Sequence, residues 1–171
     1  MSWYLIFEYH KSTCKILADD DIFGKIIDKY FKNVRDLDLI ELILEDDNID
    51  LFIKYDIPKK YINPCMNAAK HDAINILKYL HQNKYEWDSS TCAMAAENNS
   101  LRCLRYIHEN GCLWNYRTPR NAAKNGNVEC LKYALDNCCS WDISMIMEAA
   151  KHGHLNCLKY FHMHILNNQN I

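Results

Sequence analysis

One segment of the chain, from Cys65 to His164, repeats itself with a fixed step of 27 residues. The string AAKHDAINILKYLHQNKYEWD begins at position 68, and similar strings begin at positions 95, 122 and 149. A fixed period of about 20 to 50 residues is typical of a solenoid, in which each unit buries its apolar face only against its neighbours. We therefore predict a linear array of similar helical units.

Each unit carries the signals for two helices joined by a tight turn. An Asx residue follows each of the three tryptophans in the repeats, at Asp88, Asn115 and Asp142. There its side-chain oxygen can accept an unpaired N–H at the start of the first helix, helix A. An alanine pair midway along helix A allows neighbouring helices to approach closely. The second helix, helix B, follows a column of residues that tolerate a left-handed backbone: Asp72, Asn99, Gly126 and Gly153.

The chain before these repeats divides into a degenerate repeat and an N-terminal cap. DNIDLFIKYDIP echoes DAINILKYLHQN at an offset of 25 residues. The run WYLIFEY suits a short strand or an irregular cap, and a helix is predicted over about 22 to 34, after three aspartates. The predicted parts are a cap at 1–36, a degenerate repeat at 37–64, repeats at 65–91, 92–118 and 119–145, and a terminal repeat with its tail at 146–171.

The strings AAKNGNVECLKYALDN and AAKHGHLNCLKYFHMH resemble the ankyrin pattern AAxxGHLEIVKLLLxxGADVN, with Gly126 and Gly153 at the turn glycine. The resemblance covers 65–164 and, in degenerate form, 37–64. It implies an all-α solenoid of helix-turn-helix repeats. An ankyrin unit has about 33 residues, and the residues missing here lie where ankyrins build β-hairpin fingers. We therefore expect shortened or absent fingers.

The 27-residue unit, with Cys-Leu-Lys-Tyr in helix B and Trp-Asp in the loop, is similar to repeats of large DNA viruses of amoebae. That resemblance implies a viral protein acting in the host cell or virus factory. The start, MSWYLIFEYHK, is too short to span a bilayer and lacks the features of a signal peptide. We expect a soluble, cytoplasmic protein with reduced thiols and no membrane contact. A net charge of −2 argues against nucleic acid as a partner.

Cys103, Cys130 and Cys157 are interpreted as small buried hydrophobic residues, because they share a column with Ile76. The same interpretation applies to two further columns, which hold Cys112 with Cys139 and Cys65 with Cys92. The three loop tryptophans are expected to pack under the loop and lock successive repeats together. No metal and no cofactor are assigned. The alternative with a specific chemical role is a zinc site, in which His and Cys would be the ligands. Its candidate ligands are His152, His154, Cys157, His162 and His164.

No catalytic motif is present, and a chain of repeated identical residues does not build the convergent pocket of an enzyme. We predict a non-enzymatic scaffold that binds a protein partner. The ankyrin resemblance places the binding surface on helix A, at columns that vary while the frame repeats. The alternative is self-assembly into a homo-oligomer through apolar, uncapped solenoid ends. The predicted binding residues are Asn67, Lys70, Met94, Glu97, Asn121, Lys124, Glu148 and Lys151.

Overall fold

The computed structural model describes residues 37–54, 56–57 and 63–168. The chain forms two compact units, Met1–Leu37 and Asp38–Ile171, and the helices described below belong to the second, apart from the first residue of α3. The predicted N-terminal strand or cap, and the helix over 22 to 34, lie outside the described residues. No described residue lies in a strand, and no helix in this part of the chain is long and apolar enough to span a membrane.

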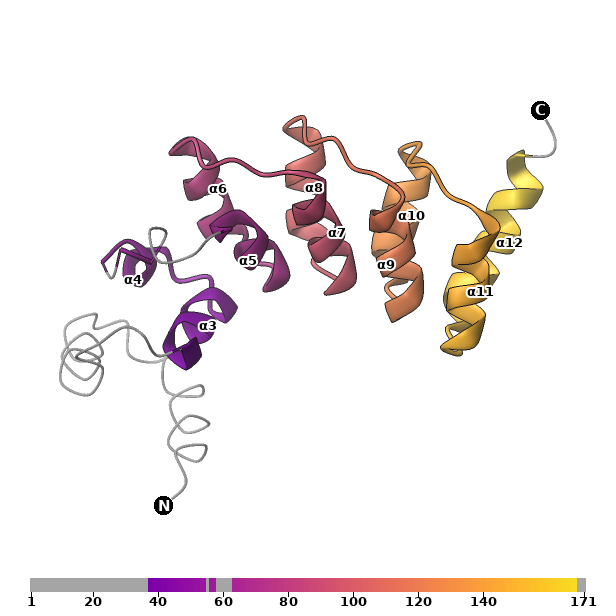
Figure 1. Cartoon of the computed structure of the whole chain (residues 1–171), viewed down its shortest axis with the longest axis horizontal. Helices are drawn as coiled ribbons and strands as arrows, with labels where there is room; N and C mark the ends of the chain where they lie inside the picture. The colour runs from indigo at the N-terminus through magenta and orange to yellow at the C-terminus, as the bar shows by residue number, and fades with distance from the viewer. Residues whose placement is uncertain (1–36, 55, 58–62, 169–171) are drawn as a thin grey trace, which may run out of the picture. The chain divides into compact units, whose positions relative to one another are not determined.

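The second unit is a succession of helix pairs (Figure 1). The short pair α3 (Leu37–Glu45) and α4 (Ile49–Lys54) lies in the predicted degenerate repeat. In each later pair, helix A is the odd-numbered helix and helix B the even-numbered one. These pairs are α5 (Pro64–Lys70) with α6 (Ile74–Gln82), α7 (Ser89–Glu97) with α8 (Leu101–Glu109), α9 (Arg117–Asn125) with α10 (Val128–Asp136), and α11 (Ile143–Lys151) with α12 (Leu155–Asn168).

Successive pairs stack into two layers. Along the helix A layer α5 contacts α7, α7 contacts α9, and α9 contacts α11, while α4, α6, α8, α10 and α12 contact one another in the same order in the helix B layer. Between the layers lies a core to which the first three 27-residue repeats contribute both alanines of their pair and the leucine column of helix B, together with Ile76 or the equivalent cysteine; the last repeat contributes Ala149 and Cys157. The predicted all-α repeat solenoid is confirmed.

The turn between helix A and helix B uses the predicted left-handed column. The backbone φ is +54° at Asp72, +59° at Asn99, +76° at Gly126 and +74° at Gly153. Asp47, between α3 and α4, has φ of +51° and continues the column into the degenerate repeat. Non-glycine residues rarely adopt this conformation, and Asn and Asp tolerate it best. The residue types in this column therefore fit the backbone that the fold requires.

The predicted caps start helix A in three repeats. Asp88 accepts the backbone N–H groups of Ser90 and Thr91, at 2.9 Å and 3.3 Å, and the hydrogen bond from the Ser90 hydroxyl holds its pKa below the ordinary value. Asp142 accepts the N–H of Ser144 at 2.8 Å. Asn115 lies one residue before the N-cap position of α9 and accepts the N–H of Arg117 at 2.9 Å.

The cysteine columns are buried, as predicted. The described part of the chain holds eight free thiols, of which only that of Cys138 is exposed. Burial raises the pKa of Cys65 and of Cys139 to about 11, because a thiolate would lose its hydration there. The thiols of Cys65 and Cys139 therefore remain neutral, and they pack as small hydrophobic groups.

Candidate protein-binding surface

All eight predicted binding residues lie on helix A, two on each of α5, α7, α9 and α11. The two on each helix are three residues apart, so they project from the same side of that helix. None is buried: Glu97, Lys124 and Lys151 are exposed, and the other five are partly exposed. We call this set the helix A surface; it consists of Asn67, Lys70, Met94, Glu97, Asn121, Lys124, Glu148 and Lys151.

Polar contacts between neighbouring helices hold parts of this surface. Asn121 Nδ2 donates to Glu97 Oε2 at 2.9 Å and to the carbonyl of Ala93 at 3.4 Å, and so joins α9 to α7. Lys70 forms an ion pair of 3.3 Å with Glu41 of α3. Because both ion-pair partners are exposed to solvent, this pair adds little to the free energy of unfolding. The positions of these side chains follow mainly from the packing of their helices.

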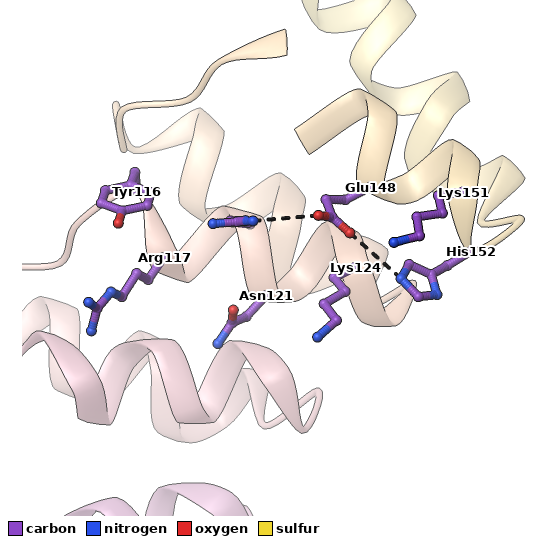
Figure 2. Close-up of a pocket in the computed structure, with 8 residues that line it drawn as sticks. Tyr116, Arg117, Asn121, Lys124, Glu148, Lys151 and His152 are labelled. Atoms are coloured by element: carbon purple, nitrogen blue, oxygen red, sulfur yellow. Dashed lines mark hydrogen bonds and ion pairs between the residues drawn. The ribbon is translucent and has the colours of Figure 1, made fainter. Parts of the chain in front are cut away.

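An open groove of about 550 Å³ runs between α9 and α11 (Figure 2). Four of its lining residues are predicted binding residues: Asn121, Lys124, Glu148 and Lys151. The sequence interpretation missed the other four, which are Tyr116, Arg117, Arg120 and His152. Arg117 could have been found from helical spacing, because it lies four residues before Asn121 on the same helix.

The groove carries four cationic side chains and one carboxylate, that of Glu148. Glu148 lies 3.5 Å from Arg120 Nη2 and 3.6 Å from His152 Nε2, and its side chain is only 23% exposed. Arg117, Lys124 and Lys151 are exposed, and none of them forms an ion pair with another described residue. The groove therefore presents uncompensated positive charge to solvent.

Two histidines of the alternative zinc cluster, His152 and His154, make other polar contacts. His152 lies beside Glu148, and Nε2 of His154 donates to the carbonyl of Lys124 at 2.9 Å. Cys157 is fully buried in the core. Among the described residues, no three His, Cys, Asp or Glu side chains are grouped so that they could hold a metal ion.

The tryptophans connect successive repeats in the helix B layer. Trp114 stacks on His108 with ring centroids 3.6 Å apart, and its ring meets Tyr133 of the next repeat edge-on at 5.8 Å. The hydroxyl of Tyr133 lies 3.0 Å from His108 Nδ1. Trp87 makes the equivalent contacts with His81 and Tyr106, although its ring is tilted by 35° to that of His81 with the centroids 4.2 Å apart. The prediction that these tryptophans lock neighbouring repeats is confirmed, although the part played by histidine was missed.

The C-terminal end of each inner helix A is satisfied by the next repeat. The side chain of the residue just before helix B donates a hydrogen bond to backbone carbonyls at the end of helix A in the previous repeat. Ser100 donates to Lys70 at 3.3 Å, Asn127 to Ala96 and Glu97 at 2.9 Å and 2.8 Å, and His154 to Lys124 at 2.9 Å. Such carbonyls lack partners within their own helix. These bonds, which we call the inter-repeat caps, fix the backbone of predicted binding residues.

Helical hairpins that recur every 27 residues, stacked in two layers with a polar helix A surface, define a repeat scaffold. Within that class, residues 92–135 and 121–162 match the family model for ankyrin repeats (many copies), so this stretch of the chain is similar to ankyrin repeats. It includes the groove between α9 and α11. Comparison with curated proteins gives no match. Ankyrin repeats generally form non-enzymatic scaffolds that mediate protein–protein interaction.

Proposed function

We propose that this chain is a non-enzymatic scaffold whose helix A surface binds a protein partner. The observation that carries the proposal is the arrangement of the variable helix A columns, which are accessible to solvent and continue into the groove between α9 and α11. The inter-repeat caps hold the backbone beneath them and reduce the ordering that binding would require.

The resemblance of the 27-residue unit to viral repeats refines this proposal. On that basis the chain is a viral protein, and its partner is a host or viral protein in the cytoplasm or the virus factory. Buried neutral thiols suit a reducing compartment of this kind.

The test is an affinity capture with charge-swapped variants. Glu97→Lys combined with Lys124→Glu changes the helix A surface and leaves the net charge unchanged. The matched control, Glu129→Lys with Lys132→Glu, makes the same swap on α10 of the helix B layer, where these two residues form an ion pair of 2.8 Å. Each protein is used to capture partners from host-cell or infected-cell lysate, with quantification by mass spectrometry.

We expect the helix A variant to capture at least about tenfold less of the partner than the wild-type protein does, whereas the control captures the same amount. Both variants should melt as the wild-type protein does, because surface substitutions usually change stability by less than about 0.5 kcal/mol. Capture of the same proteins in equal amounts by both variants would contradict the proposal. Unfolding of the helix A variant alone would assign Glu97 and Lys124 to the structural core.

A second candidate function is self-assembly through the outer face of α11. Ile143 and Met147 are 71% and 66% exposed, and Ala150 on the same face is also exposed. One repeat earlier, the equivalent residues are Tyr116, Arg120 and the fully buried Ala123, and that face of α9 receives α11. The face of α11 is thus more apolar than its covered counterpart, which suits a second copy of this chain.

Light scattering coupled to size exclusion tests this candidate. The wild-type protein should show a dimer fraction that grows over micromolar concentrations. Ile143→Lys with Met147→Lys should abolish it, because two charges would have to be buried without partners. A monomer at every concentration rules out self-assembly through α11 and leaves the scaffold proposal unaffected.

A further inference from the structure

We propose that the groove between α9 and α11 binds an acidic peptide segment, rich in Asp and Glu, that belongs to the partner. This inference rests on the proposed scaffold function and specifies the chemistry of its partner. It follows from the positions of the cations, from how Glu148 is engaged, and from where the positive surface ends.

The cations form a row along the groove. Arg117, Asn121 and Lys124 lie at i, i+4 and i+7 on α9, which places them in one stripe. Figure 2 shows them side by side, with Lys151 extending from α11. At about 1.5 Å of rise per residue, Arg117 and Lys124 are about 10 Å apart along the helix axis. An extended peptide rises about 3.3 Å per residue and points every second side chain to the same face, so glutamates at alternate positions place a row of carboxylates, about 7 Å apart, along these cations.

Glu148 does not cancel this charge. Its two carboxylate oxygens already face Arg120 and His152, one each, and the side chain is mostly covered. It therefore holds the Arg120 guanidinium beside the groove and leaves Arg117, Lys124 and Lys151 to pair with anions of a ligand. The side-chain amide of Asn121 is engaged with Glu97, so it marks the edge of the site facing α7.

Among the described residues of the helix A layer, uncompensated positive charge is confined to these two helices. On α7 the corresponding position is Glu97, and on α5 the cation Lys70 is paired with Glu41. Nucleic-acid binding generally uses a longer basic stripe and a basic protein, whereas this chain has a net charge of −2. A short acidic peptide needs only the three uncompensated cations. Tyr116, 46% exposed in the groove lining, offers an aromatic contact to the peptide backbone.

The experiment uses the full chain and a fluorescein-labelled peptide of alternating Glu and Ser, with an alternating Gln and Ser peptide of equal length as the neutral probe. Fluorescence anisotropy should show binding of the Glu-Ser peptide, weakening as the salt concentration rises, because exposed charges are screened. The Gln-Ser peptide should not bind. Lys124→Gln with Lys151→Gln should raise the dissociation constant of the Glu-Ser peptide by about tenfold or more. The control, Lys78→Gln with Lys159→Gln, removes two exposed cations from the helix B layer. It should change that dissociation constant by less than about twofold.

Three outcomes would overturn the inference: equal binding of the Gln-Ser peptide, equal weakening by the helix B control, or tighter binding of a single-stranded oligodeoxynucleotide. Circular dichroism of each variant ensures that loss of binding is not loss of fold. If the Glu-Ser peptide fails to bind while lysate capture still depends on Glu97 and Lys124, the acidic-peptide inference falls and the scaffold function stands. If that capture does not depend on the helix A surface, the scaffold proposal itself falls.

Discussion

At the scale of single residues, two glycines illustrate how one turn type is used in different surroundings. Gly126 and Gly153 have nearly the same left-handed φ, +76° and +74°. A Cβ added to Gly126 would lie 2.5 Å from Nδ1 of His154, whereas a Cβ at Gly153 would meet no atom within 4 Å. The next repeat supplies His154, so only the first turn is enclosed by a neighbour.

Alanine at the two glycines should therefore have unequal costs. Gly153→Ala should lower the free energy of unfolding by about 1 kcal/mol, the cost of a left-handed backbone with a Cβ. Gly126→Ala should cost more, because His154 must move and its hydrogen bond to Lys124 weakens. Urea denaturation measures both. The extra cost should shrink in a His154→Ala background; equal costs in the wild-type background would contradict the close packing of His154.

The cap at Asp88 should make stability depend on pH in a defined direction. A hydrogen bond from Ser90 lowers the pKa of Asp88 from its ordinary 3.8. A carboxylate with a lowered folded-state pKa stabilises the fold above 3.8, and this contribution is lost as the pH falls through the folded-state pKa. Asp88→Ala should therefore cost about 1 kcal/mol at neutral pH. Its cost should decrease in acid.

The control is Asp88→Asn, which keeps a side-chain acceptor but does not titrate. Relative to this variant, the wild-type protein should lose its advantage in acid as the Asp88 carboxylate is protonated. Urea melts at a series of pH values measure both differences. A cost of Asp88→Ala that stays constant through the acid range would mean that the charge of the cap has no effect.

At the scale of helices, the alanine pairs set the separation of the helix A layer. Ala95 is fully buried on α7, which packs between α5 and α9. Ala95→Leu should overpack this contact and lower the free energy of unfolding by about 1 to 3 kcal/mol. Ala150→Leu is the control, because Ala150 is exposed on α11 and the change should stay within about 0.5 kcal/mol. Thermal and urea melting of Ala95→Leu like the wild-type protein would contradict the packing of α7.

The helix B layer is joined by aromatic side chains and their hydrogen bonds. Tyr133→Phe should cost about 1 kcal/mol, because it leaves Nδ1 of His108 without its partner at 3.0 Å. Tyr79→Phe is a matched control in the same column, since the hydroxyl of Tyr79 makes no hydrogen bond to a described residue. The difference between the two urea midpoints measures the bond. Equal midpoints would assign the contribution to ring packing alone.

Much of the fold could be predicted from the sequence because its signals are local. The left-handed turn at Asn99 and the cap at Asp88 depend only on residues nearby in the chain, and the 27-residue step transfers them to every repeat. The buried cysteines followed from a column shared with Ile76. The bond between His108 and Tyr133 was missed because it joins residues 25 positions apart, and their contact depends on how far each repeat rotates against the next.

Only four of the eight residues that line the groove could be predicted, because the others depend on contacts between repeats. The variable columns identified Asn121 and Lys124, which line the groove. Arg120 was missed because it lies on the side of α9 that faces α11, and its partner Glu148 comes from that neighbouring helix. The charge of the groove is thus a property of two adjacent repeats together, and no column of single residues reveals it.

At the scale of the whole molecule, repeats should differ in stability according to their neighbours. The pairs α7 with α8 and α9 with α10 are packed on both sides. The outer face of α11 is open among the described residues, with Ile143 and Met147 exposed. In an array stabilised by nearest-neighbour contacts, backbone amides of α11 and α12 should exchange hydrogen before those of α7 to α10. Hydrogen exchange with mass spectrometry measures this order; uniform protection would indicate one cooperative core.

The inter-repeat caps have a consequence for how such a chain can lengthen or shorten. Ser100, Asn127 and His154 are chemically different donors that perform one task at equivalent seams. If a genetic duplication or excision within residues 92–162 spans a multiple of 27 residues in phase, each new junction again places one of these donors beside the C-terminal carbonyls of a helix A. Units can then be gained or lost by recombination while the polar groups at each seam stay paired.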